Sequence, residues 1–155
     1  MKKIKYYILL LVISGCYSLN SVEDIDKYVS YVNNRKDTIQ KSKEFETPNS
    51  DRKTFGITKI SELHNQHSDI VRVIVNIDLK ELSATYKFYY EYDNLVYSEI
   101  VESSPDKNTS EKIKKIDDVY YFKDGESIKS ISNIEKSTDE NRALILSKFY
   151  FIENF

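Results

Sequence analysis

The side chains best suited to metal binding or acid–base chemistry are two histidines, His64 and His67, the only two in the chain. Imidazoles three residues apart can share a metal ion on a helix, and Glu62 or Asp69 would then supply a third ligand. The residues between the histidines are polar and typical of a loop, which does not hold a ligand set rigidly. We therefore expect a solvated turn between strands, and no metal site.

No other pattern of residues predicts catalysis. The serines, such as Ser68 and Ser83, lie outside any G-x-S-x-G motif, and the acidic residues show no spacing that marks an acid–base pair. A phosphate-binding loop is excluded because the chain has only three glycines, and strand or turn geometry explains Gly56 and Gly125. The sequence thus predicts no catalytic residue, no cofactor and no enzymatic activity.

The single cysteine, Cys16, ends an N-terminal stretch of distinctive composition. Lys2, Lys3 and Lys5 precede an apolar run over residues 8–13, and two small residues follow it. These are the parts of a secretory signal peptide. A membrane-spanning helix needs about 20 apolar residues, so this run is too short to be one. Without a second cysteine, the rest of the chain has no disulfide and no thiolate metal site.

The order Ile13-Ser14-Gly15-Cys16 resembles the lipobox of bacterial lipoproteins. In that class the cysteine receives a diacylglycerol, the signal peptide is removed just before it, and the new amino terminus is acylated. The resemblance implies that residues 1–15 are cleaved and that lipidated Cys16 anchors the protein in a bacterial membrane. Tyr17 follows it where some lipoproteins carry an aspartate for inner-membrane retention, which implies sorting to the outer membrane.

Composition limits the partners of the remaining chain. The 155 residues carry a net charge of −2, and removal of the signal peptide takes away three lysines. The acidic product does not suit nucleic acid or electrostatic binding to anionic lipid. The length is that of one domain with a core of its own. We expect residues 16–21 to be a lipidated cysteine with a short tether, and residues 22–155 to be a single domain.

A helix is predicted at each end of this domain. Apolar residues recur at spacings of three and four from Val22 to Ile39, interrupted by Lys36, which predicts an amphipathic helix reaching residue 43. Ser21 is its expected N-cap. The polar residues 46–53 are expected to form a loop. A second helix is predicted from Ser137 to the C-terminus.

Alternating apolar residues predict strands between the helices. Residues 70–80 give the clearest single strand, and residues 54–60 a less regular one. Residues 85–101 predict a hairpin with its turn at Asp93-Asn94, and residues 119–134 a hairpin with its turn at Asp124-Gly125. We expect an α+β fold, with a mostly antiparallel sheet of about five strands and both helices packed on one face.

These elements predict which aromatic residues are buried. Two helices on one face would cover Tyr86, Phe88, Tyr90 and Tyr97, and would leave the opposite face without a cover. Tyr89 and Val96 lie on that second face, so we expect them to form a partner surface.

The functional expectation is a non-enzymatic, membrane-anchored lipoprotein of the bacterial cell envelope. It would bind a protein or another envelope component and no nucleic acid. Two alternatives follow from the same observations. A small acidic domain with an anchor also suits an immunity protein that neutralises a toxin at the membrane. A hydrolase would require a deep pocket where carboxylates converge with His64 or His67.

Overall fold

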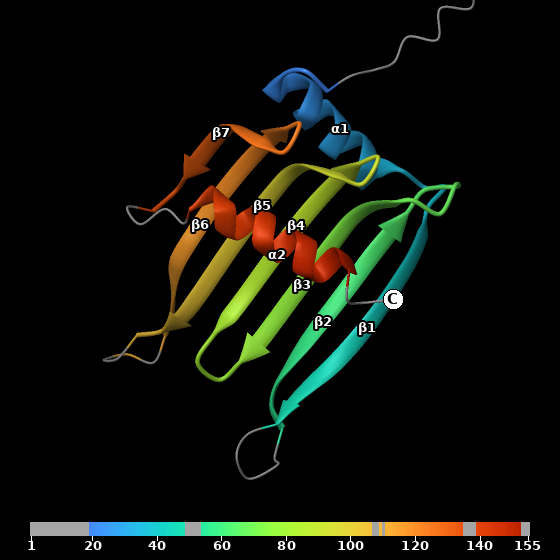
Figure 1. The fold of residues 1–155 in the computed structure, drawn as a ribbon. Coiled ribbons are helices and arrows are strands. Elements are labelled where there is room, and N and C mark those ends of the chain that lie inside the picture. Colours follow the sequence, from blue (N-terminus) through green and yellow to red (C-terminus); the bar gives the residue numbers. More distant parts are fainter. Residues whose placement is uncertain (1–18, 49–53, 107–108, 110, 135–138, 153–155) are drawn as a thin grey trace, which may run out of the picture.

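Within the part of the chain that the structure describes, seven strands form one antiparallel sheet, accompanied by two helices (Figure 1). The structure is a computed structural model that describes residues 19–48, 54–106, 109, 111–134 and 139–152. Each strand pairs with its neighbour in sequence, so the sheet is a simple meander. The prediction of about five strands is wrong, whereas the α+β class holds.

The strands run in order between the two helices. Helix α1 spans Val22–Asn34 and helix α2 spans Glu140–Ile152. The strands are β1 (Ile39–Pro48), β2 (Thr54–His64), β3 (Ile70–Leu79), β4 (Ser83–Glu91), β5 (Asn94–Pro105), β6 (Lys112–Lys123) and β7 (Glu126–Ser132).

The two helices lie on opposite faces of the sheet. Ala143 of α2 belongs to one core together with Tyr90, whereas Ile25 and Val32 of α1 belong to a second core together with Tyr89. Neighbouring residues of a strand point to opposite faces, which explains how Tyr89 and Tyr90 enter different cores. The prediction that both helices share one face is therefore wrong. In Figure 1, α2 crosses the middle strands, and α1 lies at the end of the sheet beside the β4–β5 hairpin.

Helix α1 begins where predicted and ends earlier. The Ser21 Oγ accepts a hydrogen bond from the Asp24 amide at 3.2 Å, as an N-cap does. The helix stops at Asn34, because Arg35 has an extended backbone with ψ of 135°. The Arg35 Nε donates to Asp37 at 2.6 Å directly beyond this end. Lys36, which interrupts the apolar stripe, therefore lies outside the helix.

Strand β1 replaces the predicted end of that helix and the start of the predicted loop. It is an edge strand whose residues are exposed on both faces along almost its whole length. A strand without a buried face shows no alternation of apolar and polar residues, so the pattern that reveals other strands is missing here. Its lysines and glutamates are typical of an edge, where charge discourages pairing with another sheet.

The structure confirms the predicted turn of the second hairpin at Asp124-Gly125. Asp124 and Gly125 have φ angles of 52° and 82°, which are the positive values that a type I′ turn requires. Lys123 and Glu126 pair on either side of the turn. Glycine takes such angles without steric cost, and aspartate tolerates them.

The first hairpin turns one residue earlier than predicted. Tyr92 and Asp93 have φ angles of 48° and 63°, and Glu91 pairs with Asn94. The strand register shifts between Tyr89 and Tyr90, which adds one residue to the return strand. A turn one residue earlier moves each pairing by two positions. The bulge, which has no signature in the alternation of residues, reduces this difference to one position beyond Tyr89.

Replacing Tyr92 with asparagine should stabilise the domain. Asparagine adopts positive φ more readily than an aromatic residue, whose side chain strains the turn. Strain at such a position costs on the order of 1 kcal/mol, so Y92N should raise the free energy of unfolding by up to about that amount. Urea denaturation measures the difference.

The neighbouring variant D93N is the matched control. Aspartate already tolerates positive φ, so this change should leave the free energy of unfolding almost unaltered. Equal stability of Y92N and the parent chain would show that the turn stores no strain.

Candidate functional site

Tyr89 and Val96, the predicted partner surface, are buried under α1. Only 3% of Tyr89 and 6% of Val96 is exposed. Both pack in the core that α1 forms with the sheet, together with Leu19, Leu63 and Tyr121. The expectation that this face has no cover is wrong at this end of the sheet, because α1 crosses to the face opposite α2.

A row of three tyrosine rings fastens α1 to the sheet. Tyr89, Tyr97 and Tyr121 are direct neighbours across β4, β5 and β6. The Tyr97 ring centroid lies 5.4 Å from that of Tyr89 and 5.3 Å from that of Tyr121, both in edge-to-face contact. The outer hydroxyls donate to the helix: Tyr89 to Asn33 at 2.9 Å, and Tyr121 to Asp26 at 3.0 Å. Tyr89, predicted to belong to a partner surface, therefore helps to hold the helix in place. The prediction that Tyr97 lies in the core with Tyr86 is wrong, because its ring packs on the α1 face.

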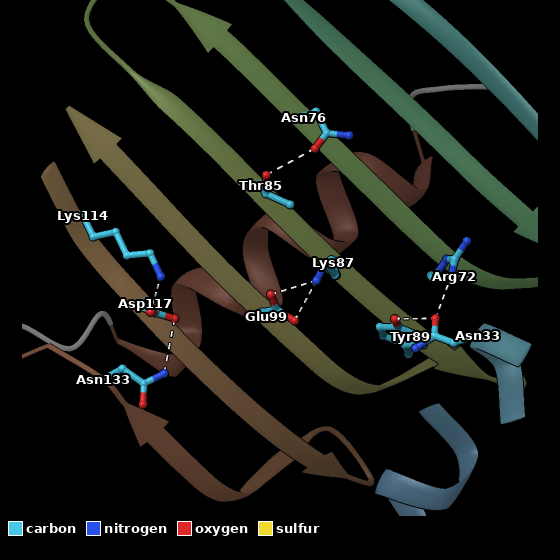
Figure 2. A network of polar contacts seen from close by, with 10 residues as sticks. All are labelled: Asn33, Arg72, Asn76, Thr85, Lys87, Tyr89, Glu99, Lys114, Asp117 and Asn133. Carbon is cyan, nitrogen blue, oxygen red and sulfur yellow. Dashed lines mark hydrogen bonds and ion pairs between the residues drawn. The ribbon is translucent and has the colours of Figure 1, made fainter. Parts of the chain in front are cut away.

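Beyond the area that α1 covers, several polar side chains of this face pair with one another. Figure 2 shows this face, with α2 behind the sheet. The Lys87 Nζ donates to both carboxylate oxygens of Glu99 at 2.9 and 3.0 Å, and Thr85 donates to Asn76 at 3.2 Å. Near the β7 edge, Lys114 and Asn133 both donate to Asp117 at 2.8 and 3.3 Å. The hydrogen bond from Lys114 holds the pKa of Asp117 below its usual range.

A second group of polar side chains is buried between α2 and the sheet. The Tyr86 hydroxyl donates to Glu102 Oε1 at 2.5 Å, and Arg142 of α2 forms an ion pair with the same carboxylate. Burial, reinforced by the bond to Glu102, raises the pKa of the Tyr86 hydroxyl well above its usual range. Glu102 therefore accepts hydrogen bonds from two donors, and its ion pair with Arg142 links α2 to β5.

Asp118 lies diagonally across the strands from Glu102. Its carboxylate accepts a hydrogen bond from the Tyr120 hydroxyl at 3.2 Å, and the residue is fully buried. The nearby Ser98 is also fully buried, and its hydroxyl has no hydrogen-bond partner. The carboxylates Glu102 and Asp118 share one covered face, and no described cavity opens on either of them.

Glu62 and His64 form a buried pair at the end of β2. Only 1% of Glu62 and 6% of His64 is exposed, and the His64 Nε2 lies 2.8 Å from Glu62 Oε2. The expectation of a solvated turn is wrong for His64, because β2 runs up to this residue and buries it. The sequence carries no sign of this, since strand β2 is irregular in its alternation of apolar and polar residues.

Hydrogen-bond chemistry places one proton between these two side chains. The His64 Nδ1 lies 3.0 Å from the Ser68 carbonyl oxygen, which only accepts, so Nδ1 carries a hydrogen. The contact between Nε2 and Oε2 then needs a proton on either the imidazole or the carboxyl group. Burial raises the pKa of the Glu62 carboxyl, and His64, Lys41 and Lys43 lower it in part. Oε1 of Glu62 has no hydrogen-bond partner.

A cavity lies between α2 and the tips of both hairpins. This cavity has a volume of about 290 Å³, near the lower limit of small-molecule pockets. Tyr90 and Phe151, with ring centroids 4.8 Å apart, form an aromatic wall. The polar lining consists of Asp93, Asn94, Asp124, Ser147 and Lys148.

Neither a metal-binding cluster nor a membrane-spanning helix occurs in the described residues. Among them, no three His, Cys, Asp or Glu side chains come together in a way that would bind a metal ion. No helix in the same ranges is long and apolar enough to cross a membrane. His67 is exposed and lies apart from the Glu62–His64 pair, in the turn after β2. Cys16, the predicted site of lipidation, lies outside the described residues.

Comparison with known proteins adds no assignment. No protein family, no curated protein and no solved structure matches this chain.

The Glu62–His64 pair should make the stability of the domain depend on pH. A carboxyl whose pKa is higher in the folded state binds protons more tightly there than in the unfolded chain. The free energy of unfolding should therefore fall as the pH rises from the unfolded value of Glu, about 4.3, through the raised folded value. In E62Q the amide donates to His64 Nε2 without a titratable proton, so this part of the pH dependence should disappear.

Urea denaturation of both proteins from about pH 4 to pH 8 measures the difference. The E91Q variant is the matched control, because burial also raises the pKa of Glu91, whereas His64 acts on the pKa of Glu62 and not on that of Glu91. It should retain the contribution of Glu62. Parallel pH profiles for E62Q and the parent chain would contradict this account of the pair.

Proposed function

We propose that this protein is a membrane-anchored lipoprotein of the bacterial cell envelope that binds a protein or another envelope component. The observation that carries the proposal is the lipobox-like order Ile13-Ser14-Gly15-Cys16 directly before a small folded domain. Lipid on Cys16 would hold the domain at a membrane surface, because two or more acyl chains anchor a protein stably. The outer membrane is the proposed location.

The start of the domain lies closer to the anchor than the sequence predicts. Leu19 falls within the predicted tether, yet only 7% of it is exposed, and it packs with the α1 core. Leu19 is three positions after Cys16, so their Cα atoms are at most about 11 Å apart in any conformation. The proposed anchor therefore holds one defined end of the domain close to the membrane.

The outer side of α2 supports a binding role. Leu146 and Tyr150 pack against the sheet core, whereas 66% of Ile145 and 52% of Phe149 is exposed. A helix that is apolar on both sides is usually covered on both sides. The cavity beside α2 adds Asp93, Asp124 and Lys148 at its rim. We propose that a partner protein places apolar side chains on Ile145 and Phe149.

Lipidation is tested directly by labelling. In a bacterial host fed labelled palmitate, the full chain should incorporate label, and C16S should incorporate none, because the acceptor thiol is missing. The S18A variant alters a residue outside the lipobox and should be labelled as well as the parent chain. Labelling of C16S, or failure to label the parent chain, would refute the anchor.

The binding surface is tested by photo-crosslinking in the native membrane. A photoreactive residue at position 145 or 149 should yield one specific adduct, which should disappear when the other position is changed to serine. Position 39 is the matched control, since Ile39 is 56% exposed on the edge strand β1, away from α2. Equal adducts from positions 39 and 145, or none from 145 and 149, would show that α2 is not the partner surface.

A further inference from the structure

The tip of the β4–β5 hairpin combines an exposed aromatic ring with a strained backbone. Tyr92 is 84% exposed, more than any other large apolar side chain of the described residues. Its φ of 48° is unfavourable for a bulky side chain, and asparagine or glycine is the usual residue at this place in a type I′ turn. The tyrosine therefore lowers the stability of the turn, and the described chain provides no burial of its ring in return.

Tyr92 lies at the end of the domain that the anchor would hold. Tyr92 and Leu19 line the same cavity, of about 100 Å³. Leu19 follows Cys16 by three residues, a span of at most about 11 Å. The hairpin tip is thus adjacent to the start of the described chain, and the lipidated residue cannot be far from it.

A second exposed tyrosine lies at the same end. Tyr31 of α1 is 56% exposed and shares with Leu19 a mostly apolar groove of about 340 Å³. Tyr28, between the two exposed rings, has its hydroxyl bonded to the Tyr90 carbonyl oxygen, and burial raises its pKa strongly. Tyr28 therefore belongs to the scaffold. The exposed rings of Tyr92 and of Tyr31, which the Arg35 guanidinium contacts at 5.3 Å, can meet a surface at this end.

The charges around these rings indicate which surface fits. The groove carries Asp24 and Glu91 together with one lysine, Lys27. Arg35, whose guanidinium lies 5.3 Å from the Tyr31 ring centroid, is paired with Asp37. This group of charges therefore has no net positive charge to attract anionic lipid. Tyrosine suits the boundary between headgroups and acyl chains, since its ring is apolar and its hydroxyl reaches polar groups. An uncharged or zwitterionic lipid surface therefore matches this end better than an anionic one.

We infer that Tyr92 and Tyr31 insert into the headgroup boundary of the membrane to which Cys16 is attached, and so orient the domain on it. This inference rests on the proposed lipid anchor. The sheet would then point away from the bilayer. Ser104 is ten residues along β5 from Asn94, so the far end of the sheet lies about 34 Å from the tip.

Tryptophan fluorescence tests the orientation, because the chain contains no tryptophan of its own. Full-length Y92W protein, purified from membranes with its lipid, is reconstituted into phosphatidylcholine vesicles with or without bromine on the acyl chains. The matched control is I113W, at the far end of the sheet, where Ile113 pairs with Ser104 and is 40% exposed. Brominated lipid should quench Y92W strongly and I113W not at all, and added anionic lipid should not change this.

Flotation with the vesicles distinguishes a failure of the proposed lipid anchor from a failure of the proposed orientation. Protein that does not float with the vesicles would refute the anchor and the orientation together. Protein that floats, with Y92W unquenched, would overturn the orientation alone and leave the tip available for a protein partner. Equal quenching of Y92W and I113W would also overturn it, because the domain would then lie flat on the membrane.

Discussion

The position of α1 on the sheet determines which part of one sheet face is covered and which end of the domain is nearest to Cys16 in the chain. Burial of the Tyr89, Tyr97 and Tyr121 rings favours a cover over this part of the face but does not specify its direction. The hydroxyls that bond Asn33 and Asp26 supply the direction, since hydrogen bonds depend on geometry. With α1 held in this way, its first turn and Leu19 lie beside the β4–β5 hairpin, which defines the end nearest to Cys16.

The other face of the sheet has a different character. There α2 covers a large aromatic core that also contains buried polar groups, among them Glu62, Ser98 and Asp118. Buried polar atoms without partners, such as Glu62 Oε1 and Ser98 Oγ, cost stability. Aromatic packing across the middle strands offsets that cost. The exposed apolar side of α2 and the nearby cavity lie on this face, whereas polar side chains of the opposite face pair with one another.

Local patterns predicted the elements that depend on local chemistry. The Ser21 cap, the strand over residues 70–79 and the Asp124-Gly125 turn are all present, because each follows from a residue's own conformational preference or from alternation along one strand. The errors arose where residues that are distant in sequence but close in space decide the local structure. Strand β1 owes its existence to pairing with β2, the bulge beside Tyr90 shifts a register, and His64 is buried by the strands around it.

The sequence by itself determined the α+β class, both hairpins and the pattern that predicts a lipid anchor at Cys16. All of these follow from composition, periodicity or contiguous motifs. Only the tertiary structure decided which face each helix covers, because a strand offers two faces and the path of the chain around the sheet edge selects between them. In the tertiary structure Tyr89 and Val96 are buried under α1, whereas Tyr92, Ile145 and Phe149 are exposed. Burial depends on the tertiary structure, so only that structure shows which surfaces are accessible to a partner.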